Sequence, residues 1–249
     1  MALILHAGKG NKNAAKSLIA AEYTGVKVEL VENFEMGVSN KTPEFLKMNP
    51  IGKVPVLETP NGAIFESNAI ARYVARLKAD NPLYGSSLID AGHVEQWIDF
   101  ATLEIDNHLI AWAEEAVISA LRRGLAALNS YLASNTYLVG HSVTLADIVL
   151  TCNLYFGFSR LLTKSFTSEF PHVERYFWTL VNQSNFKKVL GEVKQIESVL
   201  PVQSAKKPAQ PKETAKPKPR EEPKKEAKKS QQSQTNQKAG KRKRHQSPN

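Results

Sequence analysis

The sequence has almost no cysteine and no long apolar run, the features that are typical of disulfide-rich proteins and of membrane proteins. It contains one cysteine, Cys152, in 249 residues, which excludes an internal disulfide framework and a cysteine-rich zinc site. No apolar run approaches the roughly 18 residues of a membrane-spanning helix, and Met1–His6 is too short for a signal peptide. The six histidines are scattered, so we expect no metal site. These absences predict a soluble cytoplasmic protein of a reducing compartment, with no membrane partner.

Acidic residues are scarce in only one part of the chain. The net charge of +9 comes from 33 Lys and Arg against 24 Asp and Glu, and residues 201–249 hold 15 of the former but only 4 of the latter. Those residues contain seven of the 13 prolines and no aromatic residue. Such a segment buries too little apolar surface to offset the entropy lost on ordering. We therefore predict that residues 201–249 form a disordered Lys/Pro-rich tail.

The basic cluster Lys241-Arg242-Lys243-Arg244 near the end of this tail has three interpretations. It is typical of a solvated basic end, of a nuclear localisation signal, and of a nucleic-acid patch. No aromatic residue interleaves it, as base stacking would require, so the solvated end is favoured. A nuclear location through Lys241–Arg244, and weak RNA contact through charge alone, stay open.

Hydrophobic spacing in the first eighty residues predicts a small α/β unit with a mixed sheet. Thr42 and the proline after it are typical of a helix start. Asn61-Gly62 predicts a tight hairpin turn, because these residues tolerate positive φ. The other expected elements are strands at Leu3–His6, Lys27–Val31, Val54–Leu57 and Ile64–Phe65, and helices at Asn13–Tyr23 and Ser67–Leu77.

The chain from Leu88 onward is rich in helical pattern. Residues 90–133 read as one helix of unusual length, although a compact fold requires a turn near 107–115, where neither Gly nor Pro is present. Thr144 and Asp147 have the spacing of a capping box, so Asp147 is interpreted as a helix cap and not as a catalytic acid. The expected domains are therefore 1–80, 88–200 and the tail, 201–249.

Two segments at a specific spacing, Asn49–Leu57 and Phe65–Ile70, resemble the glutathione site of the glutathione transferase superfamily. The resemblance implies a thioredoxin-like α/β domain followed by an all-α domain. It also implies that Val54, before a cis Pro55, pairs with the peptide backbone of glutathione. By the same resemblance, Glu66 and Ser67 hold the γ-glutamyl end, and Lys41 and Lys53 meet the glycyl carboxylate.

Catalysis is less well supported than the fold. The superfamily activates the glutathione thiol with a Ser, Tyr or Cys just after the first strand. Here residues 8–13 contain no hydroxyl or thiol, so Asn11, Lys12 and Asn13 are the only, atypical, candidates. The helical region near Trp112 also looks shortened, which puts a second-substrate site in doubt. No cofactor is expected to be required, and glutathione stays open as a ligand or substrate.

Four further segments carry a narrower resemblance: Lys41–Leu46, Phe65–Val74, Tyr137–Gly140 and Val189–Lys194. They resemble the γ subunits of eukaryotic translation elongation factor 1B, the plant form above all. That family carries another C-terminal domain after the linker, which we expect to be absent here. The resemblance implies a non-catalytic scaffold that docks the guanine-nucleotide-exchange subunits and, through them, serves elongation factor 1A; a homodimer is compatible with it. The alternative is a glutathione S-transferase with an atypical thiol-activating residue.

Overall fold

A computed structural model describes residues 3–198 apart from residues 79, 81 and 113. Its sheet has the strand order β2-β1-β3-β4, with β1 parallel to β2 and antiparallel to β3, which in turn is antiparallel to β4. Leu5 at the centre pairs with Leu30 on one side and Leu57 on the other. The mixed sheet predicted from the sequence is confirmed, with strands at Leu3–His6 (β1), Val28–Leu30 (β2), Val56–Thr59 (β3) and Gly62–Phe65 (β4).

The hairpin between β3 and β4 forms where expected but for a partly different reason. Pro60 and Asn61 make the turn, and Gly62 has a φ of 130°. Asn61 does not have the positive φ that we predicted for it. Instead, the Thr59 hydroxyl accepts a hydrogen bond from the Asn61 backbone N–H at 3.2 Å and donates one to the Gly62 carbonyl at 2.7 Å. A threonine side chain therefore closes this turn.

The first half also contains helices and a short 3-10 turn, in addition to the sheet. The Asn11 side chain caps α1, which ends at Gly25 in the left-handed conformation with φ 66°. The Thr42 hydroxyl accepts from the Phe45 N–H and starts α2, as predicted. The helical segments are α1 (Lys12–Thr24), the short 3-10 turn η1 (Ser39–Lys41), α2 (Pro43–Met48) and α3 (Ser67–Arg76).

The second half is helical, and the expected long helix is divided. A six-residue π-helix, η3, separates α4 from α5. Helix α5 ends at Ile110 and α6 begins at Glu115, so the second break lies where a turn was expected without Gly or Pro. The segments are η2 (Pro82–Tyr84), α4 (Leu88–Phe100), η3 (Ala101–Asp106), α5 (Asn107–Ile110), α6 (Glu115–Leu132), α7 (Leu145–Arg160), α8 (Lys164–Thr167), α9 (Pro171–Val181) and α10 (Ser184–Leu190).

The buried helix α7 lies at the centre of this half, and its start confirms the predicted cap. The Asp147 carboxylate accepts hydrogen bonds from the Thr144 N–H and hydroxyl, both at 2.8 Å. It also accepts from the Leu138 N–H at 3.0 Å and the Tyr176 hydroxyl at 2.9 Å. Asp147 is fully buried, and its acceptor capacity is used by these four donors, so it is a structural residue.

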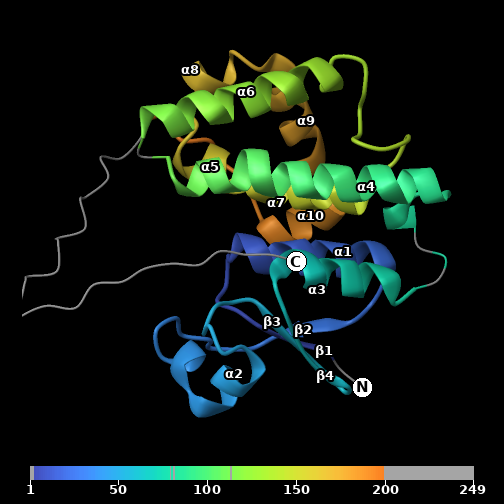
Figure 1. Cartoon of the computed structure of the whole chain (residues 1–249), viewed down its shortest axis with the longest axis vertical. Coiled ribbons are helices and arrows are strands. Elements are labelled where there is room, and N and C mark those ends of the chain that lie inside the picture. Colours follow the sequence, from blue (N-terminus) through green and yellow to red (C-terminus); the bar gives the residue numbers. More distant parts are fainter. Residues whose placement is uncertain (1–2, 79, 81, 113, 199–249) are drawn as a thin grey trace, which may run out of the picture. The chain divides into compact units, whose positions relative to one another are not determined.

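The two halves pack on each other through α1 and α3 of the first and α7 of the second (Figure 1). Helix α10 also packs on α1. The core therefore runs through both halves, and the expected boundaries near residues 80 and 88 stay predictions. The expected tail, residues 201–249, lies outside the described residues.

Candidate functional site

A cavity of about 320 Å³ opens between the two halves of the body. Lys53, Val54 and Pro55 form its wall beside the sheet, and the start of α3 adds Glu66 and Ser67. Five of the six residues predicted to bind glutathione therefore lie together. Lys41, the sixth, does not line the cavity, because it ends the turn η1 and its ammonium lies beside Gly52.

Two buried asparagines that the sequence analysis missed hold the wall beside the sheet. The Asn49 side chain donates to the Lys53 carbonyl at 2.8 Å and accepts from the Ile51 N–H at 3.2 Å. The Asn40 side chain donates to the Gly52 carbonyl at 2.6 Å. These bonds fix the loop that leads into the cis Val54–Pro55 peptide. Asn49 entered the sequence analysis only as the first residue of the segment Asn49–Leu57. Asn40 had no local signal, because its partner Gly52 lies 12 residues further along the chain.

The start of α3 presents backbone donors to the cavity. Glu66 has a φ of 72°, which non-glycine residues rarely adopt, and the helix begins immediately after it at Ser67. The first N–H groups of a helix have no partner within the helix, and the helix dipole favours a negative charge there. This end of the cavity is therefore suited to a carboxylate.

Lys16 is the functional candidate that sequence reasoning missed. It lies on α1, lines the cavity and is only 2% exposed. Its ammonium donates to the Ser67 hydroxyl at 3.3 Å and to the Asn68 side-chain carbonyl at 3.1 Å. Burial lowers the pKa of Lys16 to about 8, although the Asp106 carboxylate acts in the opposite direction. A lysine among the small apolar residues of a buried helix was the only signal in the sequence.

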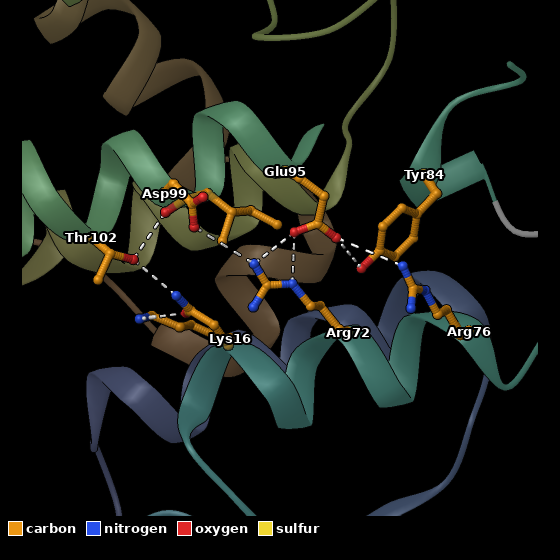
Figure 2. Close-up of polar contacts among 9 residues, drawn as sticks. Lys16, Arg72, Arg76, Tyr84, Glu95, Asp99 and Thr102 are labelled. Carbon is orange, nitrogen blue, oxygen red and sulfur yellow. Dashed lines mark hydrogen bonds and ion pairs between the residues drawn. The ribbon is translucent and has the colours of Figure 1, made fainter. Parts of the chain in front are cut away.

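The polar contacts of Lys16 continue across the helices (Figure 2). The Asn68 amide donates to the Thr102 hydroxyl at 2.9 Å, and that hydroxyl donates to the Ile98 carbonyl at 2.9 Å. Thr102 and Asp106 belong to the π-helix η3, and both line the cavity. A chain of hydrogen bonds thus connects α1, α3 and η3 on one side of the cavity.

Of the three thiol-activating candidates, only Asn13 lines this cavity. The Asn11 side chain accepts from the Asn13 and Ala14 N–H groups and is used as the cap of α1. The Lys12 ammonium pairs with Asp106 and lies 4.8 Å from the centre of the Phe156 ring. The Asn13 Oδ1 atom is buried without a hydrogen-bond partner among the described residues.

A second polar network lies between α3 and α4, further from the cavity (Figure 2). Glu95 accepts from Arg72 at 2.8 Å and from the Tyr84 hydroxyl at 3.1 Å, and Arg76 lies 3.7 Å away. Burial opposes the ionisation of Glu95, but the hydrogen bond and charge of Arg72 outweigh it and lower the pKa of Glu95. Every donor and acceptor named here has a partner, so this network is structural.

Family models match both halves of the body. The N-terminal domain of glutathione S-transferase matches residues 1–76, and the C-terminal domain matches residues 111–184. Both halves of the body are therefore similar to domains of glutathione S-transferase. Solved transferases agree: glutathione transferase F7 from Populus trichocarpa superposes with a TM-score of 0.67 at 24% identity, covering 75% of this chain and 97% of that one. A theta-class transferase from Xanthomonas axonopodis pv. citri, solved with glutathione bound, gives 0.65 at 26%, covering 77% and 98%.

Curated relatives of this transferase-like chain are translation factors by name. Elongation factor 1-gamma from Prunus avium is 74% identical over 224 residues, which are 85% of this chain and 53% of that protein. The human protein of that name is 39% identical over 213 residues, 79% of this chain and 48% of its own length. The chain therefore spans about half the length of the curated relatives it matches.

One expectation about the domains is not borne out. We expected the family's C-terminal domain to be absent, whereas a C-terminal domain of the transferase family is matched at residues 111–184. Within the described residues, no helix is long and apolar enough to cross a membrane. In the same part of the chain, no three His, Cys, Asp or Glu residues gather as metal ligands would. Cys152 is buried, and this burial raises the pKa of its thiol to about 12.

Proposed function

We propose that this chain is a non-catalytic scaffold subunit of the translation elongation factor 1B complex. In this role the transferase-like body docks the guanine-nucleotide-exchange subunits and thereby serves elongation factor 1A. The observation that carries the proposal is the 74% identity to an elongation factor 1-gamma over 224 residues, which are 85% of this chain. We attribute the activity and partners of a whole elongation factor 1-gamma to this chain only as part of this proposal.

The surroundings of the cavity support a scaffold over an enzyme. Residues 8–13 hold no hydroxyl or thiol, and two of the three substitutes among them are engaged in the fold. Asn11 caps a helix, and Lys12 is paired with Asp106. A group that already holds the fold is poorly placed to stabilise a thiolate as well. The proposed role needs surfaces for protein partners and no activated nucleophile.

Reconstitution from purified components tests the scaffold. The full chain is mixed with purified exchange subunits of elongation factor 1B, and the mixture is analysed by size-exclusion chromatography with light scattering. We expect a complex of fixed stoichiometry that persists on dilution. The variant Ser67→Ala, which alters only the cavity, should form the same complex. Separate elution of folded chain and exchange subunits at micromolar concentration would overturn the proposal.

The alternative function is a glutathione transferase with Asn13 as an atypical activating residue. One observation favours this function: Val54, Glu66 and Ser67 all line the cavity. This function requires the pKa of the glutathione thiol to fall on binding, which ultraviolet thiolate absorbance measures. Asn13→Ala should then abolish the fall and Ser67→Ala should weaken binding. An unchanged thiol pKa in the unmodified chain would remove this alternative.

A third function, nuclear or RNA-associated, rests on the tail alone. Lys241–Arg244 lie outside the described residues, so the proposal depends only on their charge. Replacing the four basic residues by glutamine should leave localisation in the cytoplasm and RNA binding unchanged if the scaffold role is the whole function. A loss of nuclear signal or of RNA retention in that variant would establish this further role.

A further inference from the structure

A second cavity, of about 630 Å³, lies between the start of α1 and the end of α7. It shares only Asn13 with the cavity of about 320 Å³ described above, so the two are separate spaces. Four partly buried apolar side chains contribute to its lining, and each has surface left that another apolar group could cover. We call this space the α7 cavity. The four side chains are those of Tyr155, Phe156, Leu161 and Ile196.

The chain beyond α10 is fixed at the rim of the α7 cavity. The Ile196 N–H donates to the Phe158 carbonyl of α7 at 3.1 Å. The Gln195 side-chain amide donates to the Leu162 carbonyl at 2.9 Å and to the Thr167 hydroxyl at 3.0 Å. Ser198, at the end of the described residues, also lines the cavity. The segment that follows Ser198 in the sequence therefore starts at this cavity.

That segment is the last apolar run of the chain. It reads Val199-Leu200-Pro201-Val202, and it lies outside the described residues. No Val, Leu, Ile, Met or aromatic residue follows Val202. Four fully extended residues span at most about 14 Å, so these side chains can reach only surfaces close to Ser198. The α7 cavity is such a surface, and covering its apolar lining is favourable.

The charges at the α7 cavity favour an uncharged occupant over a basic one. Lys12 and Arg160 both line the cavity, and Asp106 balances only Lys12. A lysine brought beside these two cations would be repelled. Residues 198–205 carry no charge, and the next cation in the sequence is Lys206. The apolar run therefore matches the cavity in charge as well as in hydrophobicity.

We propose that residues 199–202 enter the α7 cavity and fill it, so that the chain plugs its own body. Leu200 and the two valines pack against the apolar lining. Pro201 suits a buried segment, because it has no backbone N–H that needs a partner. The plug leaves no room for an apolar small molecule beside Asn13. It is independent of the proposed scaffold, because it lies within the body and involves no other protein.

The rate of cysteine alkylation in the full chain tests the plug. Iodoacetamide reacts with accessible thiolates, and Cys152 is buried, so the cysteine introduced by Val202→Cys can be followed alone by peptide mass spectrometry. The matched control is Ala227→Cys, and each rate is divided by the rate for the same variant unfolded in urea. We expect Val202→Cys to react at least roughly tenfold more slowly than the control, because the burial of one leucine alone is worth about that factor.

A second substitution shows whether apolar burial causes this protection. Leu200→Asp, added to Val202→Cys, places a charge within the run and should raise the rate to that of Ala227→Cys. Ser204→Asp adds the same charge two residues beyond the run and should keep the protection.

Three results would overturn the plug. The first is an equal normalised rate for Val202→Cys and Ala227→Cys, which would mean that the run is exposed to solvent. The second is protection that persists with Leu200→Asp, since the apolar side chain would then not be its cause. The third is protection that disappears on dilution of the protein, because the run would then be covered by a second copy of the chain and not by its own cavity.

Discussion

Two regions of the body each bury a charged side chain, and they treat it in opposite ways. In the helical half, Asp147 is fully buried and accepts four hydrogen bonds from the backbone and side chains around α7. At the cavity, Lys16 is almost as buried but finds only two neutral oxygens. A buried charge whose hydrogen bonds are all made helps to specify a fold, whereas one left without a counter-charge lowers stability.

The largest effect should come from removing the satisfied charge. Asp147→Ala leaves the donors from Leu138, Thr144 and Tyr176 without an acceptor inside the protein. We expect the free energy of unfolding to fall by about 3–5 kcal/mol, measured by urea denaturation. Asp147→Asn is the control, because it keeps one acceptor oxygen and should lose less. A loss below about 1 kcal/mol for the alanine variant would contradict a structural role.

Removing the unsatisfied charge should have the opposite sign. Lys16→Met keeps the length of the side chain but removes the buried ammonium, so we expect the free energy of unfolding to rise by roughly 1–3 kcal/mol near neutral pH. Lost hydrogen bonds to Ser67 and Asn68 limit the gain. Thermal unfolding beside the exposed-site control Lys47→Met measures it. A clear loss of stability would show that the two regions are alike after all.

The difference in the free energy of unfolding between the unmodified chain and Lys16→Met should also depend on pH. The pKa of Lys16 is lowered to about 8 in the fold from an unfolded value of 10.5. Between these values the unfolded chain binds the proton and the folded chain does not, so the unmodified chain gains stability as pH rises through this window. We expect the advantage of Lys16→Met to shrink by roughly 3 kcal/mol there. Paired urea titrations across the window measure it, and a constant gap would contradict the lowered pKa.

The smallest effect should come from removing one of the four hydrogen-bond donors to Asp147. Tyr176→Phe removes one hydroxyl donor but keeps the buried ring, leaving three donors to the carboxylate. We expect a loss of about 1 kcal/mol in urea denaturation. Thr179→Ser, on the exposed side of the same helix, is the control and should change little. A loss as large as that of Asp147→Ala would mean that the donors act as one unit.

Features coded by neighbouring residues could be predicted from the sequence. Two helix starts could be predicted because the cap and its partner are close in the chain. They are Thr42 before Pro43 and Thr144 three residues before Asp147. In both caps the partners lie within one turn, so their spacing determines the geometry. Val54-Pro55 and Glu66-Ser67 were placed in one site by the resemblance to glutathione transferases, and all four residues line the cavity.

Features that depend on distant contacts could not be predicted. Lys16 becomes a cavity residue only because Ser67 and Asn68, some fifty residues away, lie against α1. Lys12 is removed from the list of activating residues by Asp106, 94 residues away. Lys41 was placed in the site by resemblance, yet its own turn directs it toward Gly52. The contributions of Lys16 and of η3 to the cavity could therefore not be predicted from neighbouring residues in the sequence.

The π-helix η3 acts as a one-residue insertion that has been kept. An α-helix turns by roughly 100° per residue, so each extra residue rotates everything that follows it by that amount. The wider turn of η3 absorbs the added residue, and both Thr102 and Asp106 line the cavity from it. Deleting a single residue from Ala101–Asp106 would then leave a regular helix with a different set of side chains around the cavity. The phase of one helix, more than its composition, decides which charges the pocket contains.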